Sequence, residues 1–220
     1  MSAIKLPQLA WYGIKELELP LPDNWSVKFY NMAGFDRPAM KPEAMKAAIA
    51  NPIGSPPIRE LARVKNEVVI IFDDMTRATR THYLTPKTSG EEILIANTFV
   101  KANEALMIGL HVPFAATNGR EMDIVLIANA PDGQSVHYLL GNFGKTFASE
   151  QKLVTKIPPH INHLIIYSEY PDLAGLGYIE KSGKVIYVNR WDDVLRILRQ
   201  YHPSDANVAV YPNAEIQYCA

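Results

Sequence analysis

The chain is poor in cysteine and in long apolar runs. Its single cysteine, Cys219, cannot form an intramolecular disulfide, so nothing indicates an oxidising compartment, and metal or redox sites built on paired cysteines are excluded. No apolar run reaches the ~18–20 residues of a membrane span, and no apolar signal-peptide core follows Met1. We therefore expect a cytoplasmic protein with no membrane partner.

The chain also has no large excess of positive or negative charge. The formal net charge is -1 over 220 residues and the pI is near 6.6, which gives no electrostatic reason to expect nucleic acid as a partner. Neither a Gly-x-Gly-x-x-Gly motif nor a Walker sequence occurs. The hydrophobic content of 48% is enough for a substantial core, and the length fits one large domain or two small lobes.

Short apolar runs rich in β-branched residues alternate with helical segments. This alternation predicts an α/β fold, with a mostly parallel, Rossmann-like sheet and flanking helices. The predicted strands are 11–19, 27–30, 67–72, 92–96, 123–128, 163–167, 184–188 and 208–211, with 215–218 as a possible continuation of the last. The predicted helices are 42–50, 57–63, 102–110, 134–140 and 191–201.

A polar stretch divides the chain into two parts. After a buried strand, an α/β chain usually continues into a helix, but here Thr88-Ser89-Gly90 leads straight to the next strand. We therefore predict an N-terminal part over 1–86, a linker over 87–91 and a C-terminal α/β part over 92–220.

The best candidate for a small-molecule site follows the predicted strand 67–72. Ligands of open α/β sheets lie outside the carboxyl ends of the strands. Residues 73–80 supply carboxylates, hydroxyls and guanidinium groups there, among them Asp74, Thr76 and Arg77. An arginine fork matches a carboxylate or phosphate, so the segment predicts an anion site. The alternative is that Asp74 caps a helix and pairs with Arg77 on its surface.

Two further residues should face the same edge of the sheet. Lys101 and His137 follow the next two strands, and His137 could exchange a proton near neutral pH. The alternatives are a solvated first helical turn for Lys101 and a histidine bonded to a backbone carbonyl for His137. His160 and His163 should lie on opposite faces of a strand, so we expect no metal site there.

Several of these stretches resemble a known family. Residues 11–13, 21–23, 51–57 and 74–77 are similar to the opening domain of the lactate racemase family, and residues 96–105, 123–138 and 209–214 are similar to its closing domain. The family interconverts 2-hydroxy acids with a nickel-pincer nucleotide. The resemblance implies that Asp74, Thr76 and Arg77 lie in the cleft for cofactor and substrate.

The long section that separates these two parts in the family has no counterpart here. It carries the lysine that tethers the cofactor and the histidines that bind nickel and move the substrate proton. We therefore expect a shortened lactate-racemase-like protein with no assignable catalytic residue, in which the nickel-pincer nucleotide is not retained. Its ligand would be a small anion, a 2-hydroxy acid or a nucleotide phosphate, held by Asp74, Thr76 and Arg77 with Lys101 and His137 nearby.

Two other functions stay open. The chain could be a non-catalytic anion-binding or scaffold domain. It could also be a phosphotransferase with Asp73 or Asp74 as nucleophile, although side chains of adjacent residues diverge along a strand. The sequence does not indicate the oligomeric state.

Overall fold

The structure, a computed structural model of the whole chain, describes residues 2–10, 13–69, 84–99, 102–134 and 154–219. The chain divides into two compact units, which are described separately below. The first unit comprises residues 1–33 and 78–220, and the second comprises residues 34–77.

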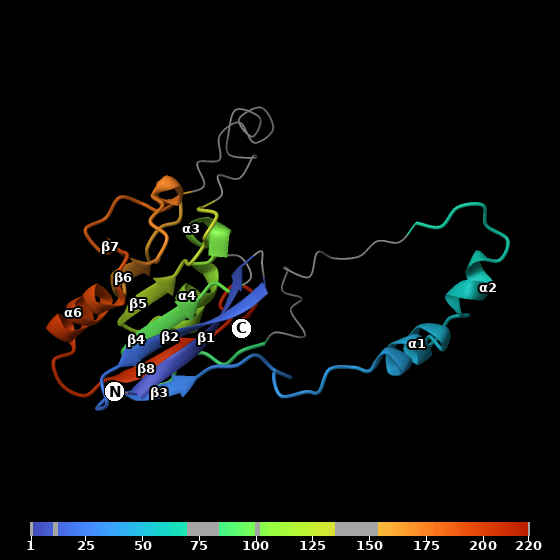
Figure 1. Cartoon of the computed structure of the whole chain (residues 1–220), viewed down its shortest axis with the longest axis horizontal. Helices are drawn as coiled ribbons and strands as arrows, with labels where there is room; N and C mark the ends of the chain where they lie inside the picture. Colours follow the sequence, from blue (N-terminus) through green and yellow to red (C-terminus); the bar gives the residue numbers. More distant parts are fainter. Residues whose placement is uncertain (1, 11–12, 70–83, 100–101, 135–153, 220) are drawn as a thin grey trace. The chain divides into compact units, whose positions relative to one another are not determined.

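A six-stranded sheet forms the centre of the first unit (Figure 1). Its strand order is β3-β8-β4-β5-β6-β7, and each neighbouring pair runs parallel. This confirms the predicted α/β class with a parallel, Rossmann-like sheet. The strands are β3 (Ser26–Phe29), β4 (Ile93–Asn97), β5 (Met122–Ile127), β6 (Ile161–Tyr167), β7 (Val185–Val188) and β8 (Asn207–Tyr211).

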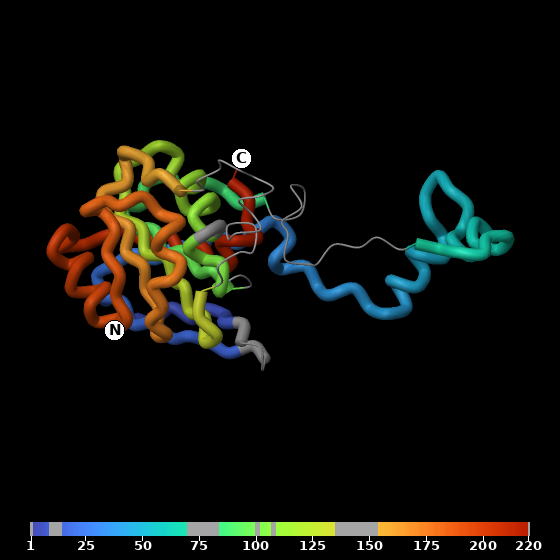
Figure 2. Tube along the Cα trace, turned by 90° about the horizontal axis from the view of Figure 1, so that it is seen from above, coloured from blue at the N-terminus to red at the C-terminus, as the bar shows by residue number. Residues whose placement is uncertain are grey.

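The central strands are buried along their whole length because both faces of the sheet are covered. Every residue of β4 and β5 is buried, as expected for strands packed between two layers. One layer consists of the antiparallel hairpin β1 (Ser2–Ala10) and β2 (Gly13–Leu21) and the helix α6 (Trp191–Tyr201). Figure 2 shows this hairpin as a blue layer along one side of the first unit.

Short helical pieces cover the other face of the sheet. They are η1 (Ala102–Glu104), α3 (Ala105–Ile108), α4 (His111–Ala116) and η3 (Ala174–Tyr178). The sequence predicted one helix over 102–110, and the break has a local cause. A side chain at Gly109 would lie 2.7 Å from the Ala105 carbonyl oxygen and 2.9 Å from Thr98 Cγ2, so only glycine allows the chain to turn this close to β4.

In its described residues, 34–69, the second unit contains two helices and no strand of the sheet. α1 (Pro42–Ala50) has the predicted bounds, with proline in its first turn, and α2 (Ile58–Ala62) lies inside the predicted helix 57–63. Neither helix has a buried residue. The predicted buried strand 67–72 is wrong over 67–69, which form no strand, and Val68 and Val69 are 55% and 76% exposed. Residues 70–72 lie outside the described residues.

Two other predicted segments differ from the structure. The proposed continuation over 215–218 is not a strand. Residues 212–216 form a turn, and Tyr218 makes an isolated bridge with Leu84. Most of the predicted helix 134–140 lies outside the described residues. The first strand of the hairpin, β1, was not predicted, although Ile4 and Leu6 alternate with polar residues as in a half-buried strand.

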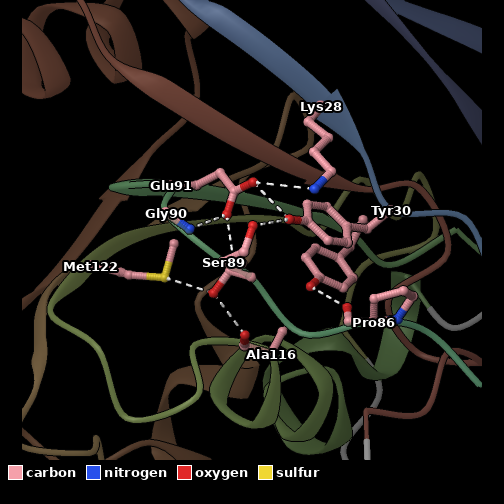
Figure 3. A network of polar contacts seen from close by, with 10 residues as sticks. Lys28, Tyr30, Pro86, Ser89, Gly90, Glu91, Ala116 and Met122 are labelled. Atoms are coloured by element: carbon pink, nitrogen blue, oxygen red, sulfur yellow. Dashed lines mark hydrogen bonds and ion pairs between the residues drawn. The ribbon is translucent and has the colours of Figure 1, made fainter.

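Residues 84–91 are fixed to the sheet by buried polar contacts (Figure 3). The Tyr30 hydroxyl donates to Glu91 Oε1 at 2.6 Å, and the backbone N–H groups of Ser89 and Gly90 donate to Glu91 Oε2 at 2.8 and 3.0 Å. Lys28 Nζ lies 3.9 Å from the same carboxylate. Burial favours the neutral acid, but these donors outweigh it and lower the pKa of Glu91 from 4.5 to about 2.

A stacked pair of tyrosine rings extends this cluster. Tyr30 stacks on Tyr211 with ring centroids 5.1 Å apart, and the Tyr211 hydroxyl donates to the Pro86 carbonyl oxygen at 2.8 Å. Burial raises the pKa of Tyr211 and raises that of the neighbouring Cys219 thiol to about 11. The segment before β4 is therefore an ordered part of the first unit. The division of the chain into two parts joined by a linker over residues 87–91 stays a prediction.

Candidate functional site

The carboxyl ends of β4, β5, β6 and β8 meet at one edge of the parallel sheet. From β4 the chain proceeds to β5, β6 and β7 on one side, whereas β8 lies on the other side of β4. The order of the strands therefore changes direction between β4 and β8, and open α/β sheets bind ligands at such a point. We take this edge as the candidate site.

An asparagine closes the edge at the change of direction. Asn97, the last residue of β4, is 1% exposed, and its Nδ2 donates to the carbonyl oxygens of Pro7 and Pro212, each at 2.8 Å. Its Oδ1 accepts a hydrogen bond from Gln8 Nε2 at 2.8 Å. The side chain of Asn97 thus joins the hairpin to the ends of β4 and β8, and the hairpin forms one wall of the site.

A second asparagine joins the next two strands at the same edge. Asn129 follows β5 and is 4% exposed, and its Nδ2 donates to Glu169 Oε2 at 2.9 Å. The Glu169 N–H donates back to Asn129 Oδ1 at 2.8 Å, which fixes the Glu169 carboxylate just beyond β6. Burial raises the pKa of Tyr167 to about 12, and the negative charge of Glu169 makes a smaller contribution.

A small pocket opens between this edge and the hairpin. It encloses about 90 Å³, well below the 300–1,000 Å³ that is usual for drug-sized ligands. Its lining includes Gln8, Lys15, Glu16 and Leu17 of the hairpin and Asn129, Pro131, Glu169 and Tyr170 of the sheet edge. The sequence analysis did not identify these residues. Four of them, Asn129, Pro131, Glu169 and Tyr170, lie shortly after β5 and β6, and this position could have indicated them. The hairpin residues could not have been found in this way, because only tertiary packing brings them to the pocket.

The loops after β5 and β6 also hold each other. Asp172 accepts hydrogen bonds from the N–H groups of Ala174 at 2.9 Å and Gln134 at 2.7 Å, and these bonds lower the pKa of its carboxyl group. Gly133 has φ +81°, and a side chain there would lie 2.6 Å from Asp172 Oδ2. The start of the segment that leads to His137 is thus positioned by the loop after β6.

The five site residues predicted from the sequence lie outside the described residues. They are Asp74, Thr76, Arg77, Lys101 and His137. The structure places only their neighbours: Thr98, whose hydroxyl donates to the Ile127 carbonyl oxygen at 2.6 Å, precedes Lys101 just beyond β4. The convergence of the five side chains stays a prediction.

His160, His163 and His202 have structural partners. His160 Nε2 lies 2.9 Å from the Thr117 hydroxyl, while His163 Nδ1 and His202 Nε2 contact the two carboxylate oxygens of Asp123. Within the described ranges, no group of three histidine, cysteine, aspartate or glutamate side chains could hold a metal ion. His82 and His137 lie outside these ranges.

Comparison with known proteins shows what part of this chain is similar to. The sequence profile of the lactate racemase N-terminal domain matches residues 12–111. The lactate racemase of Lactiplantibacillus plantarum is 34% identical over 88 residues. Over residues 12–111 the chain is similar to the lactate racemase family. The matched residues include the segment with Asp74, Thr76 and Arg77, as the resemblance in the sequence predicted. They also include residues 96–105, which were predicted to resemble the closing domain. The resemblance of residues 123–138 and 209–214 to the closing domain stays a prediction.

The similarity to the lactate racemase covers part of each protein. The aligned region is 39% of this chain and 20% of the relative, so this chain matches about a fifth of that protein's length. This partial similarity does not by itself transfer the activity of the whole enzyme to this chain. In the part of the chain that the structure describes, no helix is both long and apolar enough to cross a membrane.

Proposed function

We propose that this chain is a lactate-racemase-like protein of the cytoplasm that binds a small anionic ligand, a 2-hydroxy acid or a nucleotide phosphate, at the carboxyl edge of its sheet. The observation that supports this most is the change of strand direction between β4 and β8, which lies beside the segments that lead to Lys101 and His137. Residues 67–69 form no strand of the sheet, so the assignment of Asp74, Thr76 and Arg77 to this ligand rests on the region that matches the family. Arg77 would hold the carboxylate or phosphate with its fork of N–H donors.

Binding without racemisation is the form of this function that we propose. Racemisation at a 2-hydroxy carbon needs a group on each face of that carbon to accept and return a proton or hydride. His160, His163 and His202 contact Thr117 or Asp123 and are not arranged as such a pair. In the family, the nickel-pincer nucleotide supplies this chemistry, and the section that carries its lysine tether and its histidines has no counterpart in the sequence of this chain. We therefore assign no catalytic step to this chain.

Replacing Arg77 tests this proposal. Lactate or phosphate should raise the melting temperature of the wild-type chain by mass action, by a few degrees at a concentration about tenfold above its Kd. The Arg77→Ala variant should bind at least about tenfold more weakly, because it loses the charged fork that pairs with the anion. Arg63→Ala, in the second unit beyond α2, is the matched control and should leave the shift unchanged.

The same experiment separates the alternatives. Equal shifts for wild type and Arg77→Ala would overturn the assignment to this segment, and no shift with any of these anions would favour a scaffold domain. Lactate racemisation with added cofactor, abolished by Arg77→Ala, would contradict binding without catalysis. Magnesium-dependent hydrolysis of a phosphate ester, lost in Asp73→Asn, would support the phosphotransferase instead.

A further inference from the structure

The pocket between the hairpin and the sheet edge has an unusual arrangement of charge. Its lining contains one cation, Lys15, and two carboxylates, Glu16 and Glu169. Glu16 is already paired, since Lys5 Nζ lies 3.2 Å from its Oε1. In the described part of the chain, no carboxylate lies within 4.0 Å of the Lys15 ammonium, so Lys15 and Glu169 offer one positive and one negative charge to the same hollow.

The walls that carry these two charges are fixed. The reciprocal hydrogen bonds with buried Asn129 use Glu169 Oε2 and leave Oε1 as an acceptor. On the hairpin side, Gln8 Nε2 donates to the Pro7 carbonyl oxygen at 2.9 Å and to Asn97 Oδ1 at 2.8 Å, so both of its N–H donors are used and its Oε1 is left as an acceptor. The pocket thus combines an ammonium group with two acceptor oxygens.

This pattern complements a small zwitterion. We propose that the pocket binds a small α-amino acid, whose carboxylate pairs with Lys15 and whose ammonium group is held by Glu169 and the carbonyl oxygen of Gln8. A plain anion would be repelled by the negative charge of Glu169, and a plain cation would be repelled by the positive charge of Lys15. The volume of about 90 Å³ restricts the ligand to a few non-hydrogen atoms, as in glycine, alanine or serine.

A titration of the full ¹⁵N-labelled chain with L-alanine, followed by NMR, tests this site. We expect the amide signals of Gln8, Glu169 and Tyr170 to shift with a Kd of about 1–10 mM. Propionate and ethylamine each carry half of the charge pattern and should bind at least about tenfold more weakly. Saturation of these signals by propionate or ethylamine at the same concentrations as alanine would overturn the proposal.

Variants at the two charges complete the test. Lys15→Met and Glu169→Gln should each weaken alanine binding at least about tenfold, while Lys46→Met on α1 should not change it. A wild-type-like amide spectrum of each variant shows that it is folded. Unchanged alanine affinity in both variants, or no shifts up to about 50 mM alanine, contradicts the site. Arg77→Ala should leave alanine binding intact, so this result is independent of the anion site proposed above.

Discussion

Glu91→Gln should destabilise the chain by about 3 kcal/mol at pH 7. In the folded protein, hydrogen bonds from Tyr30, Ser89 and Gly90 outweigh the effect of burial and lower the pKa of this carboxyl from 4.5 to about 2. A lowered folded-state pKa stabilises above the unfolded pKa, and the contribution is lost as the pH falls from about 4.5 through about 2. The variant should therefore differ from wild type by only about 1 kcal/mol at pH 3. Urea unfolding at both pH values measures this difference.

A carboxylate outside this cluster provides the control. Glu16 is 59% exposed and pairs with Lys5, so Glu16→Gln should change the free energy of unfolding by less than about 1 kcal/mol. A second variant, Tyr30→Phe, removes one donor to Glu91 and should raise the pKa of that carboxyl. If Glu91→Gln destabilises equally at pH 7 and pH 3, the ionised carboxylate is not the stabilising species, and the cluster acts through packing alone.

The double variant His163→Ala/His202→Ala should lose about 3–5 kcal/mol of stability. Asp123 is 2% exposed, and its two oxygens contact His163 Nδ1 at 2.8 Å and His202 Nε2 at 2.7 Å. These contacts join the start of β5 to the start of β6 and to the residue after α6. Removing both imidazoles takes away the contacts that they make with the buried Asp123 carboxylate. This costs more free energy than the loss of two ordinary hydrogen bonds. Thermal and urea unfolding at pH 7 measure the loss.

A double-mutant cycle separates the charge from the packing. His163 also stacks on Tyr201, with ring centroids 4.0 Å apart, so part of the loss is due to that contact. In an Asp123→Asn background, removing both histidines should cost at least about 1 kcal/mol less than in wild type. Equal costs in both backgrounds would show that Asp123 does not couple to the histidines. His111→Ala, on the exposed first residue of α4, should be within about 0.5 kcal/mol of wild type.

The parallel sheet could be predicted because the amino-acid composition of its strands reflects their burial. A strand covered on both faces contains few polar residues, so β4, β5 and β6 were recognisable as short continuous apolar runs. The helix α6 was equally clear, since Val194, Leu195 and Leu198 recur at helical spacing and are buried. These features depend on neighbours in the chain or on burial alone.

Strand pairing could not be predicted, because it depends on contacts between distant residues. The run 67–72 has the composition of a buried strand, yet residues 67–69 are exposed and unpaired, while β8 lies beside β4 instead. The local sequence does not decide between such competing partners. The same applies to the pocket, whose lining residues Gln8 and Lys15 are brought to the sheet edge only by the packing of the hairpin.

The candidate site was predicted by its position along the chain. The rule that ligands lie beyond the carboxyl ends of parallel strands directed attention to the residues after each strand. It did not single out Asn97 and Asn129, because asparagine after a strand is also a common turn residue. Their role in joining strand ends is visible only from the partners of their side chains.

Mapping lactate binding on the labelled chain tests the proposed anion site most directly. Amide signals of Asn97, Asn129, Ser168 and Asn213 report on the carboxyl edge of the sheet, and those of Asp123 and His163 report on the opposite edge. We expect lactate to shift the first group, leave the second unchanged, and have at least about tenfold lower affinity for the Arg77→Ala variant. Shifts confined to Asp123 and His163 would contradict a ligand site at the carboxyl ends of the strands, and equal binding by Arg77→Ala would contradict the role of Arg77 in that site.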